Sequence, residues 1–178
     1  NAFSLGGAVT LGDAVKNGVL TFTGAGTLSS ALSLTAASDL RFTGAIGGGT
    51  NTLTKSGSGE VTLGGPNTYT GLTTVSGGTL TLDGGAAIAD TAGVTLNSGV
   101  TLKLAASETV GMLNGSGAVN LQGNALTVGG ASASAHSGVI SGTGTLVKSG
   151  AGALTLSGAN TFSGGATVSL GSVLLGNA

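Results

Sequence analysis

The sequence predicts an all-β fold, a parallel β-solenoid (β-helix) of eight to nine turns with no capping helix. Three observations support this class. Apolar residues alternate with a period of two in short bursts, glycine-rich corners separate the bursts, and one long segment occurs twice. Because such a repeat cannot bury its own apolar face, it must stack on further turns of the same kind.

The bursts place one face of each short strand in a core and the other in solvent. Their intervening residues are mostly Thr, Ser or another small polar residue. No stretch carries the 3.6-residue stripe of a helix. The bursts are Val9-x-Leu11, Leu32-x-Leu34, Leu40-x-Phe42, Val61-x-Leu63, Leu80-x-Leu82, Val94-x-Leu96, Val100-x-Leu102-x-Leu104, Val119-x-Leu121, Leu126-x-Val128, Leu154-x-Leu156 and Val168-x-Leu170.

The corners between the bursts are rich in glycine, with 37 glycines and a single proline in 178 residues. Glycine allows a positive φ and a close approach of two backbones, both of which a tight corner requires. Aromatic residues make up only 3% of the chain, which disfavours a β-sandwich. A propeller is disfavoured because no blade signature recurs every 40–50 residues or so.

The repeated segment begins at residue 53 and again at residue 146, 93 positions later, and aligns without a gap. Leu-Thr-Lys-Ser-Gly-Ser-Gly becomes Leu-Val-Lys-Ser-Gly-Ala-Gly, and Asn-Thr-Tyr becomes Asn-Thr-Phe. We therefore expect residues 1–178 to form one solenoid domain of two related halves, with the repeat motif at 53–82 and 146–175.

This motif closely resembles the autotransporter-associated β-strand repeat of bacterial secreted passenger domains. The resemblance covers roughly 30 residues in each copy and about a dozen ordered positions. It implies a right-handed β-helix that is exported to the bacterial cell surface, so the expected location is extracellular.

Within the motif, the paired residues Gly57, Gly59, Gly150 and Gly152 are expected to form tight corners. Asn67 and Asn160 should satisfy backbone groups at a corner, while Tyr69 and Phe162, two residues later, fill the core. The two matched lysines, Lys55 and Lys148, are interpreted as corner residues that discourage the pairing of edge strands.

Composition excludes several classes of function. A net charge of −1 offers no footprint for nucleic acid, and no apolar run reaches the ~20 residues of a membrane-spanning helix. The chain has no Cys, and its single His136 stands in a loop-like run of small polar residues, so we expect no metal and no cofactor.

Catalysis is not expected, because the six acids are spread along the chain rather than grouped. Asp39 and Arg41 are interpreted as a solvated ion pair and Glu60 as a solvated turn residue. The six acids are Asp13, Asp39, Glu60, Asp83, Asp90 and Glu108.

The apolar pattern continues from the last residue of the chain into the first. Leu82 is followed 6, 12 and 14 residues later by Ile88, Val94 and Leu96. If residue 1 of another copy followed residue 178, Phe3, Val9 and Leu11 would stand at the same intervals after Leu175. Neither end shows a polar cap, and the chain starts without Met or a signal peptide, so we expect it to be processed or part of something longer.

These features predict a structural protein that stacks head to tail, or repeats in tandem, to build a bacterial surface fibre or stalk. Its partner is therefore another copy of itself. The alternative is a fragment of a passenger domain that acts in adhesion or biofilm formation, with a host or matrix surface as partner. The assembly junction is expected at Phe3, Leu5, Val9, Val173, Leu174 and Leu175.

Overall fold

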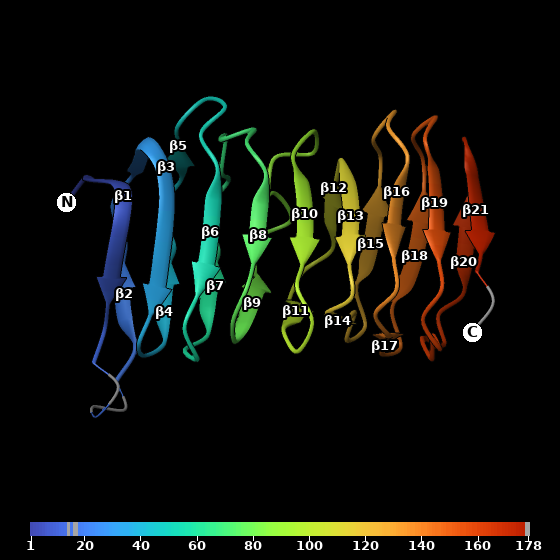
Figure 1. The fold of residues 1–178 in the computed structure, drawn as a ribbon. Helices are drawn as coiled ribbons and strands as arrows, with labels where there is room; N and C mark the ends of the chain where they lie inside the picture. The colour runs from blue at the N-terminus through green and yellow to red at the C-terminus, as the bar shows by residue number, and fades with distance from the viewer. Residues whose placement is uncertain (14, 16–17, 177–178) are drawn as a thin grey trace.

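The computed structural model describes residues 1–13, 15 and 18–176, and every regular element in them is a β-strand. The strands stack in a row of turns, with the two ends of the chain at opposite ends of the row (Figure 1). All recorded strand pairs are parallel, and successive turns pair residue by residue. The predicted all-β parallel β-helix is confirmed.

Three sheets form the three sides of the solenoid. We call them sheets A, B and C, in the order in which the chain visits them within a turn. Sheet A runs β1 (Phe3–Leu11), β3 (Gly26–Ala36), β6 (Leu53–Ser56), β8 (Thr73–Val75), β10 (Gly93–Leu96), β13 (Met112–Gly115), β16 (Ser134–His136), β19 (Ala153–Leu156) and β21 (Ser172–Leu175), with β5 (Ile46–Gly47) beside β3.

Sheets B and C are shorter. Sheet B consists of β2 (Leu20–Phe22), β4 (Leu40–Phe42), β7 (Val61–Leu63), β9 (Thr79–Leu82), β11 (Thr101–Leu104), β14 (Ala118–Asn120) and β17 (Ile140–Ser141). Sheet C consists of β12 (Glu108–Val110), β15 (Ala125–Val128), β18 (Thr145–Lys148) and β20 (Ala166–Val168). The nine successive strands of sheet A make about eight turns.

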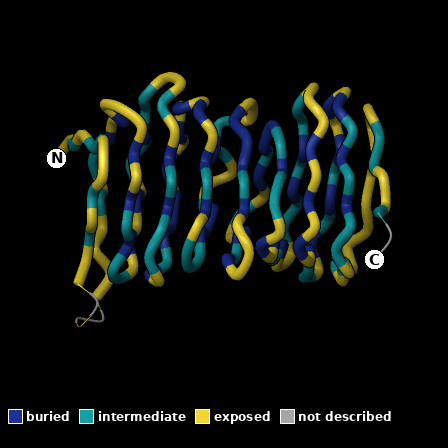
Figure 2. The backbone as a smooth tube through the Cα atoms, in the orientation of Figure 1, coloured by how far each residue is buried: buried dark blue, intermediate teal, exposed yellow. Residues whose placement is uncertain are grey.

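The core is a set of stacked columns of inward-facing side chains. Leu53 pairs with Thr73, 20 residues on, and Leu154 pairs with Val173, 19 residues on. Each turn therefore sets its apolar residues above those of the turn before, and the inward positions of the middle turns are covered from both sides. Figure 2 shows the result, with buried backbone along the middle turns and more exposed backbone at both ends.

The two copies of the repeat occupy different sides of the solenoid. The first copy supplies β6, β7, β8 and β9, which alternate between sheets A and B. The second supplies β18, β19, β20 and β21, which alternate between sheets C and A. Each strand of the second copy therefore lies one side earlier in the turn than its counterpart, so the motif is not tied to one particular side.

Candidate functional site: repeat corners and open ends

The four corner glycines lie directly against the backbone of the preceding turn. A Cβ atom on Gly57, Gly59, Gly150 or Gly152 would stand 2.3, 2.2, 2.1 or 2.1 Å from a carbonyl oxygen of that turn. Among the four, only Gly57 has a positive φ, of 78°. Close stacking of turns, more than backbone conformation, is therefore the reason for glycine at these corners.

Asn67 connects three successive turns in the first copy. Its Oδ1 accepts a hydrogen bond from the N–H of Ile46 at 2.7 Å, and its Nδ2 donates to the carbonyl of Ala87 at 2.7 Å. Tyr69 is completely buried, and its hydroxyl shares a 2.9 Å hydrogen bond with the hydroxyl of Thr73. These side-chain bonds hold the side of the turn that has no sheet strand at this level.

In the second copy, the matching asparagine and aromatic residue make only some of these contacts. Asn160 Oδ1 accepts from the N–H of Ile140 at 2.8 Å, which repeats the bond to the preceding turn. The bond to a following turn has no counterpart within the described residues. Phe162 is half-buried where Tyr69 is fully buried.

The two matched lysines are buried, contrary to the expectation that they face outward at the corners. The ammonium of Lys55 donates to the carbonyls of Gly57 at 2.9 Å and of Gly77, one turn later, at 2.6 Å. Lys148 donates to the carbonyl of Gly150. The aliphatic stem lies in the core while the ammonium satisfies corner carbonyls, and burial lowers the pKa of Lys55 to about 8.

Glu108, one of the six acids spread along the chain, is also buried. Its Oε2 and Oε1 accept hydrogen bonds from the N–H groups of Ala87 at 3.1 Å and Ile88 at 3.0 Å. Burial raises the pKa of the Glu108 carboxyl. The signal in the sequence was the alternation Glu108-x-Val110, which puts the carboxyl in the inward phase of β12.

The single histidine is also in the core. His136 lies in β16, not in a polar loop, and only 1% of it is exposed. Within the described part of the chain, neither of its ring nitrogens has a hydrogen-bond partner, nor does the hydroxyl of Ser134. Burial lowers the pKa of His136.

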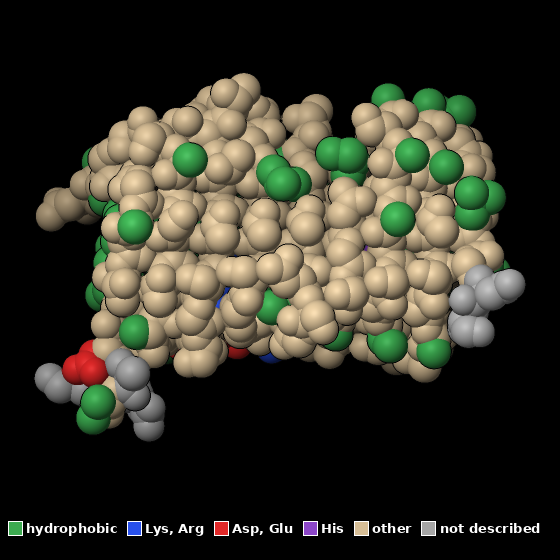
Figure 3. All heavy atoms as spheres, viewed as in Figure 1, with side chains coloured by type: hydrophobic (Ala, Val, Ile, Leu, Met, Phe, Trp, Pro, Cys, Tyr) green, Lys and Arg blue, Asp and Glu red, His purple; other side chains and the backbone are tan. Residues whose placement is uncertain are grey.

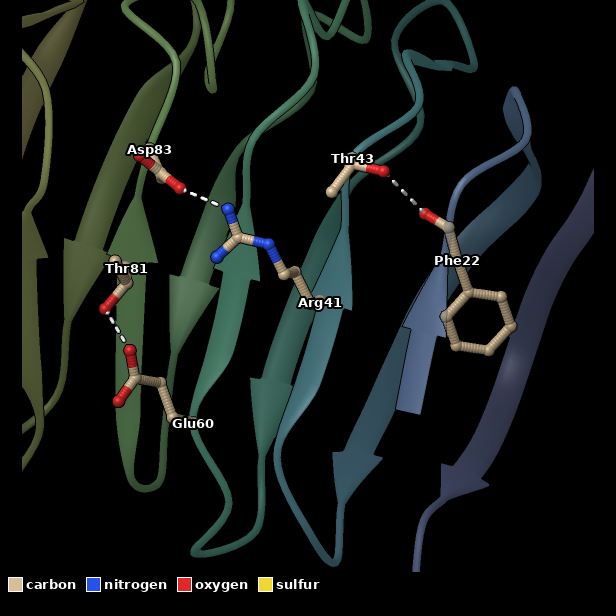
Figure 4. Close-up of polar contacts among 6 residues, drawn as sticks. All are labelled: Phe22, Arg41, Thr43, Glu60, Thr81 and Asp83. Carbon is tan, nitrogen blue, oxygen red and sulfur yellow. Dashed lines mark hydrogen bonds and ion pairs between the residues drawn. The ribbon is translucent and has the colours of Figure 1, made fainter. Parts of the chain in front are cut away.

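The exposed charged side chains form a pattern different from the expected one. Arg41 Nη2 donates a hydrogen bond to Asp83 Oδ2 at 2.6 Å, two turns away (Figure 4). Asp39 instead accepts a hydrogen bond from the backbone N–H of Glu60. The Glu60 carboxylate is half-buried and accepts from the hydroxyl of Thr81 at 2.6 Å. Partners in a solenoid come from neighbouring turns, about 20 positions away, so spacing along one strand does not find them.

The junction residues of the first end are partly covered. Phe3, Leu5 and Val9 are half-buried and pack against the core. The ring of Phe3 lies 5.2 Å from that of Phe22 and 5.8 Å from that of Phe42, measured between centroids. This end therefore presents an aromatic stack together with an edge of β1 that pairs with no other described strand.

The second end is more open. Leu175 is 80% exposed although it occupies the inward column above Leu156, and Val173 is half-buried. Leu174 is also exposed, at 52%, but it lies between these two residues in β21, so its side chain points to the outer face of sheet A. Hydrophobic side chains appear at this end in Figure 3, while most of the face shown there is small polar side chains and backbone.

The described residues contain no group of three or more His, Cys, Asp or Glu side chains that could hold a metal ion. None of the elements described is a helix long and apolar enough to cross a membrane.

Comparison with known proteins gives one match. The family model of the passenger-associated-transport-repeat matches twice, at residues 53–82 and 146–175, which are the two copies of the motif. No curated protein and no solved structure matches the chain. The chain is therefore a β-solenoid that carries two copies of the passenger-associated-transport-repeat, the autotransporter-associated repeat.

Proposed function

We propose that this solenoid is a structural unit of an extracellular bacterial fibre or stalk, and that it grows by end-to-end stacking. The observation that carries this is that the apolar pattern after Leu82 is repeated from Leu175 into the start of another copy of the chain. Leu175 occupies an inward core position above Leu156. Its counterpart in the first copy, Leu82, is completely buried by the next turn. An apolar core position and a free strand edge at the same end favour the addition of another turn.

The passenger-associated repeat supports a secreted or cell-surface location for this unit. The proposed role is mechanical. Backbone hydrogen bonds between turns, and the apolar column beneath them, continue from one unit to the next. No catalytic step, cofactor or nucleic acid is part of it, and the partner is a further copy of the same solenoid.

The test is the size of the native protein over a range of concentrations, by sedimentation and electron microscopy. We expect rods much larger than one 16.4 kDa chain. A denaturing gel then separates the two forms of the array, because a 16.4 kDa band indicates stacked subunits and a giant band indicates covalent tandem repeats.

Leu175→Asp should prevent assembly, because it places a charge in the apolar contact. Leu174→Asp is the matched control, because the exposed Leu174 side chain points away from the core and its replacement should leave assembly intact. Phe3→Asp should also block growth, although the loss of its contacts with Phe22 and Phe42 makes it the less clean variant. Monomers at every concentration would contradict the proposal, and ligand binding on the lateral side of such monomers would favour adhesion instead.

A further inference from the structure

The first copy of the repeat shows which turn follows the second copy, provided that contacts transfer between copies. On the preceding side, where both copies are covered, they do. The bonds to the turn before each copy are those of the asparagines, since Asn67 accepts from the N–H of Ile46 and Asn160 from that of Ile140. Within each copy the contacts also match, because the N–H of Ser76 donates to the carbonyl of Lys55 at 2.8 Å and the N–H of Ser169 donates to the carbonyl of Lys148 at the same distance.

On the following side, the first copy is covered by β10. Val94, Thr95 and Leu96 pair with Thr73, Thr74 and Val75 of β8. Counted 93 positions on, the three residues of β10 fall at 187–189, which are residues 9–11 of a chain that follows residue 178. Those residues are again Val-Thr-Leu, and they form the second half of β1.

We propose that a second copy of this chain adds to the end formed by β20 and β21, so that β1 of the incoming copy is hydrogen-bonded to β20 of the copy before it. This pairing deepens the stacking proposed above and depends on it. The register sets Val9 opposite Ala166, Thr10 opposite Thr167, and Leu11 opposite Val168. The edge of β20 available for it is free of any other described strand, and all three of its residues are exposed.

The same transfer finds a partner for Leu175. Leu82 pairs with Leu104 in the first copy, and residue 104 moved on by 93 positions is Val19 of the incoming chain. Leu175 is 80% exposed and Val19 is 60% exposed. Two of the most exposed apolar side chains of the molecule therefore cover each other across the junction.

The pairing implies a rotation of one side, a third of a turn, between successive copies. β1 belongs to sheet A and β20 to sheet C, so sheet A of the incoming copy continues sheet C of the one before. The unrotated alternative would extend sheet A, with β1 on β21. The register of sheet A would then set Ala8 opposite Leu174.

Unrotated stacking leaves a strand position empty. After β21 on sheet A, the next position in the turn is on sheet B. The first part of β1, Phe3–Leu5, stacks in the same column as Ile46 two turns later. Hydrogen bonds of the Asn67 and Glu108 side chains continue that column turn by turn to β12 of sheet C. An incoming unrotated copy therefore starts on sheet C and skips sheet B, whereas a copy rotated by one side starts on sheet B and fills every position.

Disulfide cross-linking tests the register, because the chain has no cysteine of its own. Neighbouring parallel strands place opposite Cα atoms ~4.8 Å apart, which lies within the range of a disulfide. Thr10→Cys and Thr167→Cys report the rotated junction, and Ala8→Cys with Leu174→Cys report the unrotated one. All four side chains are exposed in the single unit.

Each pair of single-cysteine variants is mixed, assembled and oxidised, and the cross-linked heterodimer is measured by mass. We expect the Thr10→Cys and Thr167→Cys mixture to cross-link and the Ala8→Cys and Leu174→Cys mixture to stay at the background level of unassembled protein. The reverse result, or assembly with neither cross-link, would overturn the rotated junction and leave end-to-end stacking in place. Absence of any assembly by sedimentation would overturn stacking itself.

Discussion

The two copies of the repeat share a sequence motif but differ in their degree of burial. Leu82 and Val75 of the first copy are completely buried, whereas their counterparts Leu175 and Val168 are 80% and 50% exposed. The first copy lies in the middle of the solenoid, and the second forms its last described turn. Burial in this fold is therefore a property of the neighbouring turns, and a change at matched positions should have very different effects in the two copies.

The largest difference is expected for Leu82→Asp against Leu175→Asp. The first places an unpaired carboxylate in the closed core and should lower the free energy of unfolding by about 4 kcal/mol or more. The second, measured in unassembled protein, should change it by at most about 0.5 kcal/mol, as at an exposed site. Urea unfolding followed by circular dichroism measures both. Equal losses would show that the second copy is covered in the same way as the first.

Gly59→Ala is next in size. Its Cβ would stand 2.2 Å from the carbonyl oxygen of Ser38 in the turn below, so the two turns must separate. We expect a loss of about 1–3 kcal/mol in the same unfolding measurement. Gly123→Ala is the control, because the nearest atom there is a side-chain oxygen at 3.6 Å and no positive φ is required. A control as damaging as Gly59→Ala would mean that close stacking is not what selects glycine at the corners.

A smaller difference is expected for the aromatic pair. Tyr69→Phe removes the hydrogen bond to Thr73 and leaves that buried hydroxyl without its partner, at a cost of about 1–2 kcal/mol. Phe162→Tyr should be close to neutral, because the residue that corresponds to Thr73 in the second copy is Ala166. Thermal unfolding of the two variants beside the wild type measures the difference. No loss of stability in Tyr69→Phe would show that the hydrogen bond to Thr73 does not stabilise the first copy.

A further effect is a dependence of stability on pH. Burial lowers the pKa of Lys55 to about 8, from 10.5, so between these values the unfolded chain holds a proton that the folded chain has lost. The free energy of unfolding should therefore rise with pH from about 8 to 10.5. Below pH 8 Lys55 is protonated in both states, and the cost of burying its charge is present in full. Urea unfolding at several pH values measures the rise, and Lys55→Met should abolish this part of it. An identical pH profile in Lys55→Met would contradict the buried ammonium.

The sequence was sufficient to predict the architecture, because alternation and glycine corners are local signals. It was not sufficient for Lys55 and His136, which were assigned to a corner and to a polar loop, and it gave no position for Glu108. Their position was nevertheless visible in the alternation, since Leu53-x-Lys55, Glu108-x-Val110 and Ser134-x-His136 all place the polar side chain in the inward phase of a strand.

The contact partners of exposed charged side chains could not be predicted from the sequence. The bond from Arg41 to Asp83 depends on how many residues each turn takes, and that number varies from turn to turn. The shift of the second copy to another side of the solenoid has the same origin, because 93 residues are not a whole number of turns. Such relationships require the three-dimensional register and cannot be obtained from spacing alone.

Amide hydrogen exchange at low and high protein concentration tests the central claim most directly, namely that a following turn completes the second copy. Amides of β8 and β9 in the first copy should exchange slowly at both concentrations. Amides of β20 and β21 should exchange quickly in dilute protein and become as slow as those of the first copy when the protein assembles. Fast exchange in β20 and β21 at every concentration would contradict it.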